Sequence, residues 1–212
     1  MKSALIIVDV QNDFCKGGAL EVKNGNDVIP VINNLVKSNK FDFIIATQDW
    51  HPSSHKSFAS NHKNKNVYDV IKLKGITQVL WPDHCIQRTK GSKFHKDLEL
   101  GEIYKVIKKG TNPEIDSYSG FYDNDHKSST GLAEYLKAKN IDTVYITGLA
   151  TDYCVKFTAL DSEKEGFKTF VIKDAVKGVN INKDDSEKAF AEMKENGIRI
   201  VKKNLEIIYR ID

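Results

Sequence analysis

Short apolar runs rich in β-branched residues alternate with amphipathic segments along this chain, and this alternation limits the fold more than any other feature. A continuous apolar run is typical of a strand that is buried on both faces. Strands that alternate with helices form a mostly parallel sheet covered on both sides. We therefore expect an α/β fold with three αβα layers, Rossmann-like, and six strands at residues 4–8, 41–46, 103–107, 142–147, 167–172 and 198–201.

Four amphipathic segments supply the expected helices, because their apolar residues recur at helical spacing. They lie at Val28–Val36, around Leu132–Leu136 with an end near Asn140, from Val155 to Gly166, and from about 185 to 196. The 212 residues are enough for one domain with a large core, and no linker or internal repeat divides them. We expect a single domain over residues 1–212, with an irregular, polar excursion at about 53–101 that covers the active site.

The charge balance and the cysteines exclude several classes of partner. A net charge of +3 from 32 basic and 29 acidic side chains is too weak an excess for a nucleic-acid or membrane-surface protein. The early apolar run at 4–8 is cut by Asp9 and is too short for a signal peptide or a membrane span. Three widely spaced cysteines do not make a disulfide framework. We expect a cytoplasmic protein with free thiols and no nucleic-acid or membrane partner.

Reactive side chains stand where four of the expected strands end. These are Asp9, Asp49 with His51, Lys109 and Cys154. Each alone has an ordinary interpretation, such as a turn aspartate, a solvated loop histidine or a surface lysine. The carboxyl ends of parallel strands lie at one edge of a sheet, so these groups are able to converge there. The four strand ends together predict one site.

Cys154 is the candidate nucleophile of that site. The segment Gly148–Val155 joins a strand to a helix, which places Cys154 in the first helical turn, where unpaired N–H groups favour a thiolate. Most free cysteines act only as small buried apolar residues, so the residues around Cys154 decide whether it is a nucleophile. Asp9, with a pKa raised by burial, can act as base and then acid, and Lys109 can hold it and favour the thiolate. The N–H groups of Ala150 and Cys154 are expected to form an oxyanion hole.

Asp49 and His51 are candidate metal ligands. Residues i and i+2 on an extended strand end point the same way, so their side chains share one face. A third ligand is needed, and either His84 or His55 can supply it. A carboxylate with imidazoles suits zinc, iron or manganese, with water in the open positions. From the spacing of Asp49 and His51 alone, the alternative to a metal site is a solvated loop with no ligand.

Six segments stand in a characteristic order along nearly the whole chain. They are Leu5–Phe14 with Gly17-Gly18, Thr47–Pro52, Trp81–Cys85, Lys109-Gly110, Tyr118–Phe121 and Gly148–Val155. In this order they resemble the nicotinamidase (pyrazinamidase) branch of the isochorismatase-like cysteine hydrolase family. The Gly-x-Ala-Thr-Asp-x-Cys element is typical of the family broadly. The Asp-x-His pair with Trp-Pro-x-His-Cys is typical of the nicotinamidase branch.

The resemblance implies an isochorismatase-like fold and a metal-dependent amidohydrolase. Such an enzyme converts nicotinamide to nicotinate and ammonia through a thioester, as part of NAD salvage. The implied roles are a catalytic triad of Asp9, Lys109 and Cys154, metal ligands Asp49, His51 and His84, and pocket-lining aromatics Phe14, Trp81 and Tyr118. The implied cofactor is one divalent ion, zinc first, with Fe²⁺ or Mn²⁺ as alternatives. A cis peptide bond is expected between Leu149 and Ala150.

Some points stay open at this level. His55 is either a further ligand or a neighbour that hydrogen-bonds a metal-bound water. The rival functions are a family amidohydrolase for carbamoyl or ureido compounds, or a non-catalytic thiol and metal binding module with Cys15 and Cys85 as resolving thiols. We expect these two cysteines to be bystanders. Nicotinamide is the expected partner, and a homo-oligomer is left open.

Overall fold

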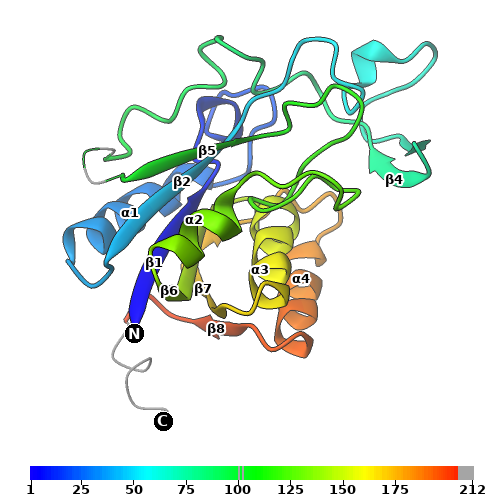
Figure 1. Cartoon of the computed structure of the whole chain (residues 1–212). Coiled ribbons are helices and arrows are strands. Elements are labelled where there is room, and N and C mark those ends of the chain that lie inside the picture. The colour runs from blue at the N-terminus through cyan, green and yellow to red at the C-terminus, as the bar shows by residue number, and fades with distance from the viewer. Residues whose placement is uncertain (100, 102, 205–212) are drawn as a thin grey trace.

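The computed structural model describes residues 1–99, 101 and 103–204. Its main sheet has six strands in the order β5-β2-β1-β6-β7-β8, and every neighbouring pair is parallel. The strands are β1 (Lys2–Val8), β2 (Phe43–Asp49), β5 (Lys105–Lys109), β6 (Ile141–Leu149), β7 (Lys168–Lys177) and β8 (Arg199–Val201). The expected α/β fold with a six-stranded parallel sheet is confirmed (Figure 1).

Helices cover both faces of this sheet (Figure 1). Alternate residues of β1 point to opposite faces, as the pleat of a strand requires. Leu5 and Ile7 pack with the apolar residues of α1 (Val28–Lys37). Ala4, Ile6 and Val8 pack on the other side with the remaining helices, α2 (Leu132–Ala138), α3 (Lys156–Lys164) and α4 (Asp185–Glu195). All four expected helices are therefore present. None of the helices in the described ranges is long and apolar enough to cross a bilayer.

The segment 53–101 is largely irregular, with a turn of 3₁₀ helix at Ala59–Asn61 and a small antiparallel hairpin of β3 (Val70–Leu73) and β4 (Ile76–Val79). Two further 3₁₀ turns lie earlier in the chain, at Asn12–Phe14 and Gly25–Asp27. Figure 1 shows the 53–101 segment, coloured cyan to green, beyond the carboxyl ends of the strands. Single β-bridges tie it to residues at those ends, one of them between His51 and Ile86. This segment thus contributes to the edge where the candidate residues lie.

The six strands are found, but their boundaries differ from the expected ones, most of all at β2, β5 and β7, which runs on to Lys177. β2 and β5 start and end later than the apolar runs at 41–46 and 103–107, because their parallel ladder continues through polar residues to the pair Asp49 and Lys109. Backbone hydrogen bonds form regardless of side-chain polarity, so the ladder outlasts the apolar pattern. Cys154 lies in a π-helical turn, Thr151–Val155, ahead of α3, and the Val155 N–H donates to the Ala150 carbonyl at 3.0 Å. The cis bond between Leu149 and Ala150 is present as expected.

Candidate active site

The order of the strands brings the four candidate positions together. β5, β2, β1 and β6 are consecutive in the sheet, and their carboxyl ends carry Lys109, Asp49, Asp9 and Cys154 in that order. Lys109 and Asp49 are direct partners in the parallel register, so their side chains share a face. Oxygens of Asp9 and Asp49 and the sulfur of Cys154 all lie within 4.8 Å of one another. The convergence predicted from the sequence is therefore found at the sheet edge.

The Lys109 ammonium is at the centre of this group. Its Nζ lies 2.9 Å from Asp9 Oδ2 and 3.4 Å from Cys154 Sγ, and it donates hydrogen bonds to Asp49 Oδ1 and to the Ser117 carbonyl. The side chain is completely buried. Burial alone would lower the pKa of Lys109, but Asp49 and Asp9 raise it well above the usual value. Lys109 therefore stays charged and joins the two carboxylates to the sulfur.

Asp9 has the properties of a catalytic base. Thr47 donates a hydrogen bond from its hydroxyl to Asp9 Oδ1 at 2.6 Å, and the Asp9 N–H donates to the same Thr47 oxygen at 3.2 Å. Burial raises the pKa of Asp9 to about 6, against the opposing charge of Lys109. A carboxyl group with a pKa near 6 is able both to accept and to return a proton at neutral pH.

Cys154 departs from one expectation. The sequence predicted that the helix terminus and Lys109 would favour a thiolate, but burial raises the pKa of Cys154 well above its usual value, and Asp9 and Asp49 add to this against Lys109. The prediction underestimated desolvation, since the thiol is almost fully buried and an anion there loses its hydration. The resting group is therefore a thiol, which must lose its proton to a nearby base when it reacts.

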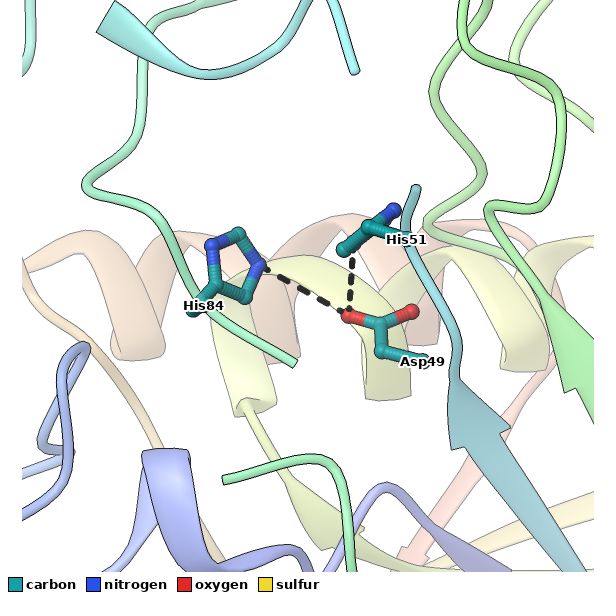
Figure 2. Close-up of side chains that lie close together, drawn as sticks. All are labelled: Asp49, His51 and His84. Atoms are coloured by element: carbon teal, nitrogen blue, oxygen red, sulfur yellow. Dashed lines mark ion pairs between the residues drawn. The ribbon is translucent and has the colours of Figure 1, made fainter. Parts of the chain in front are cut away.

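Asp49, His51 and His84 gather their donor atoms on one side of this centre (Figure 2). Asp49 Oδ2 lies 3.5 Å from His51 Nε2 and 3.9 Å from His84 Nε2. Asp49 and His51 come from the end of β2, whereas His84 comes from the segment that follows β4. Burial alone would raise the pKa of Asp49, but Lys109 and His51 hold it well below its usual range. The group offers one ionised carboxylate and two imidazoles.

Hydrogen bonds at Nδ1 of His51 and of His84 decide which ring nitrogen is available to bind a metal. His51 Nδ1 lies 2.8 Å from the Gly110 carbonyl, and His84 Nδ1 lies 2.8 Å from the Pro82 carbonyl. A carbonyl only accepts, so each Nδ1 carries a proton, and in its neutral form each ring directs the lone pair of Nε2 toward Asp49. A side chain at Gly110 would meet the His51 ring, with the added Cβ 2.3 Å from its Cε1. Three oriented ligands fit a catalytic divalent metal such as zinc.

His55 differs from His51 and His84 in the hydrogen-bond partners of its Nδ1. The Ser57 N–H points at His55 Nδ1 at 3.2 Å, a contact that favours a neutral His55 with its proton on Nε2. Burial lowers the pKa of His55 to about 4, which makes the neutral ring the form at pH 7. His55 Nε2 is buried without a hydrogen-bond partner, although His55 lies in a group with His51 and Asp116. His55 Nδ1 also lies 2.7 Å from the Ser57 hydroxyl, which can donate to this nitrogen or accept from it. His55 therefore keeps both roles expected from the sequence, a further ligand or a hydrogen-bonding neighbour of the metal site.

A single cavity joins the metal-ligand group to the sulfur. Phe14, Trp81 and Tyr118, the three aromatics named from the sequence, line it with Asp49, His84, Ala150 and Cys154. Trp81 Nε1 donates to the Tyr118 hydroxyl at 3.1 Å, which fixes two of the aromatic walls against each other. The cavity thus has aromatic and apolar walls, with a nucleophile and an imidazole at its boundary. Such a site suits a flat ring with one polar substituent.

Several site residues were not predicted from the sequence. Asp116, Tyr153, Leu20 and Val179 also line the cavity, and Thr47 hydrogen-bonds Asp9. Thr47 stands two residues before Asp49 on the same strand, so period-two alternation was a signal that could have found it. Tyr153 precedes Cys154 in the π-helical turn, whereas Leu20, Asp116 and Val179 come from loops whose paths no local pattern gives. Cys15 and Cys85 are buried free thiols outside the lining of this cavity, and their role as bystanders stays a prediction.

Comparisons with known proteins agree with this geometry. The isochorismatase domain model matches residues 3–204. A nicotinamidase of Acinetobacter baylyi is 48% identical over 203 residues, 95% of this chain and 94% of that protein. A nicotinamidase of Escherichia coli is 46% identical over 92% of each chain.

Solved structures give the same result. The Acinetobacter baumanii nicotinamidase/pyrazinamidase superposes with a TM-score of 0.92 at 48% identity, covering 95% of this chain and 96% of that one. A yeast nicotinamidase bound to the inhibitor nicotinaldehyde has a TM-score of 0.90 at 34% identity, over 94% and 99%. A Pyrococcus horikoshii pyrazinamidase in complex with zinc has a TM-score of 0.77 at 40% identity, over 95% and 99%.

Proposed function

This chain belongs to the isochorismatase family, and on that basis we propose that it hydrolyses nicotinamide to nicotinate and ammonia. The observation that carries the proposal is the single aromatic cavity bounded by both Cys154 and His84. Relatives named nicotinamidase over nearly the full chain support the same substrate. Nicotinamide presents a flat ring and one carboxamide, which are the two features that this cavity is built to receive.

The proposed roles follow from the contacts. Asp49, His51 and His84 would hold one divalent ion, for which we propose zinc because a similar pyrazinamidase is in complex with it. When bound, the ion supplies a Lewis-acidic anchor for the pyridine nitrogen of the substrate. Phe14, Trp81 and Tyr118 hold the ring from its sides. We propose that His55 donates a hydrogen bond from Nε2 toward this region.

The proposed chemistry is acyl transfer to sulfur. Asp9 takes the Cys154 proton as the sulfur attacks the carboxamide carbon, which avoids a free buried thiolate. The oxygen of the tetrahedral intermediate is stabilised by the N–H groups of Ala150 and Cys154. Asp9 then protonates the departing ammonia and leaves a thioester. Asp9 next takes a proton from the water that attacks the thioester and gives it to the Cys154 sulfur as the C–S bond breaks, which restores the thiol; the released acid loses its proton to solvent as nicotinate. Lys109 keeps its charge throughout and orients Asp9.

Ammonia release from a small set of amides tests the proposed function. We expect nicotinamide to be hydrolysed faster than carbamoyl or ureido compounds, because these lack a ring nitrogen for the anchor. A strong chelator is expected to stop turnover, and added zinc to restore it. Faster release from a ureido compound would contradict the proposal, as would full activity after the metal has been removed and its absence verified by elemental analysis.

The pKa of Asp9 predicts the acid side of the pH profile. The pKa is raised from 3.8 to about 6, so the base form is lost as the pH falls through about 6. Below that point kcat/KM should fall about tenfold per pH unit, since it reports groups on the free enzyme. The measurement is kcat/KM for nicotinamide from about pH 5 to 8, with circular dichroism confirming the fold at each point. A profile flat down to about pH 5 would contradict this role of Asp9.

We also propose that residues 1–212 form one domain in which the 53–101 segment covers the site, since this segment supplies Trp81 and His84 to the cavity. The cytoplasmic location and the open question of a homo-oligomer stay as predictions from the sequence.

A further inference from the structure

Asp152 lies two residues before Cys154, and both oxygens of its carboxylate accept hydrogen bonds from one loop that is distant in sequence. Asp152 Oδ1 accepts the Val179 N–H at 2.9 Å, and Oδ2 accepts the Asn180 N–H at 2.8 Å. Asn180 has a φ of 53°, in the left-handed region, so the two successive N–H groups turn toward the same anion. Consecutive N–H groups in this geometry form a concave anion cradle. The carboxylate therefore attaches the loop at two points to the turn that carries the nucleophile.

The loop held in this way reaches the catalytic cavity. Val179 lines that cavity together with Cys154, Trp81 and Phe14. Gly178 shows how tightly the loop is held, because an added Cβ would lie 2.1 Å from Ser186 Oγ and 3.0 Å from Asp152 Oδ1. Ser186 at the start of α4 donates its N–H to Asn180 Oδ1 at 2.9 Å. Two independent anchors thus fix the loop, and Asp152 is the one that belongs to the nucleophile turn.

Packing does not fill the space on the other side of Asp152. A second cavity of about 460 Å³ lies there, lined by Asp152, Asn182, Asp185 and Phe157 among others. It shares Tyr118 and Tyr153 with the catalytic cavity. On this side the loop between β7 and α4 has no packing partner among the described residues to hold it, so the hydrogen bonds to Asp152 contribute to its position beside the contacts of Val179 with the core.

We infer that Asp152 is a positioning residue for substrate binding: its carboxylate holds the 178–180 loop so that Val179 closes one wall of the nicotinamide cavity. This inference rests on the proposed function for the identity of the substrate. It assigns Asp152 no proton transfer and no contact with the reacting atoms. Its effect is on how tightly the ring is held, with little effect on bond making at Cys154.

The first test separates binding from chemistry with Asp152→Asn. Asparagine keeps the shape but replaces one acceptor with an amide N–H₂, so one of the two bonds to the loop is lost. We expect KM for nicotinamide to rise about 10-fold while kcat changes less than about 3-fold, because one apolar contact is worth about that much in a binding pocket. The matched control is Glu192→Gln, which removes a negative charge from the same second cavity, has Lys156 and not the loop as its partner, and should leave both constants unchanged.

Two further measurements distinguish positioning from general destabilisation. Val179→Ala should raise KM to a similar extent, and the double variant should be no worse than either single variant, because both act through one side chain. Amide hydrogen exchange in Asp152→Asn should accelerate at Val179 and Asn180 while the β6 amides keep their wild-type rates. Multiplying effects in the double variant would overturn the inference, as would an unchanged KM or faster exchange throughout the protein.

The wild-type enzyme, assayed in parallel, separates this inference from the proposed function. If wild type releases no ammonia from nicotinamide, the proposed function fails, and the exchange rates at Val179 and Asn180 alone decide whether Asp152 holds the loop. If wild type is active but Asp152→Asn has wild-type KM, only the inference about Asp152 fails.

Discussion

Replacing Cys154 with alanine is expected to lower ammonia release from nicotinamide by at least about 10⁴-fold, because the covalent step loses its nucleophile. The substitution removes one sulfur from a packed position and adds no bulk. Lys109 keeps Asp9, Asp49 and the Ser117 carbonyl as partners, so the ion-pair network remains. The variant should therefore fold, bind metal and bind nicotinamide. Steady-state turnover, elemental analysis and calorimetric titration with nicotinamide measure these three properties.

Cys15→Ala is the matched control, since it removes a buried free thiol that is not among the cavity-lining residues. It should keep wild-type turnover if its fold is intact. Wild-type activity in Cys154→Ala would show that another group attacks the substrate. Loss of metal in Cys154→Ala would show instead that the sulfur is a ligand, in agreement with a different grouping of Asp9, Asp49 and Cys154.

The second large effect is expected for His51→Ala. The substitution removes the His51 ring, which the hydrogen bond from Nδ1 to the Gly110 carbonyl orients so that Nε2 faces Asp49. Only Asp49 and His84 then remain in the ligand group. Catalytic zinc sites need three protein ligands, so metal affinity should fall by more than about 100-fold, with activity lost at limiting zinc. A competition titration with a chromogenic chelator measures the affinity independently of turnover.

His55→Ala is the comparison that makes this test sharp. His55 is also a buried imidazole near His51, and we propose for it the tautomer in which Nδ1 accepts the Ser57 N–H and Nε2 carries the proton. Its removal should change metal affinity by less than about 10-fold, as expected for a group outside the ligand set. If both variants lose metal equally, His55 is a ligand and the tautomer inferred from Ser57 is wrong.

The sequence predicted much of this site because its residues lie at strand ends. Asp9, Asp49, Lys109 and Cys154 follow or end β-rich runs, and all parallel strands finish at the same edge. Phe14, Trp81 and Tyr118 required the family resemblance, since no periodicity places a loop aromatic in a pocket. Thr47 and Asp116 were missed, although Thr47 carried an alternation signal. The thiolate preference of Cys154 was wrong because local helix geometry does not report how deeply a sulfur is buried.

By itself, the sequence determined the α/β class, the strand and helix segments and the set of reactive groups, because these depend on apolar periodicity and on neighbours along the chain. Only the tertiary structure decided the strand order β5-β2-β1-β6, which makes Lys109 a partner of both carboxylates. It alone decided the orientation of the His51 ring, which is set by the Gly110 carbonyl from beyond the end of β5. The physical reason is that burial, hydrogen-bond partners and electrostatic fields arise from residues distant in sequence, and local patterns do not contain them.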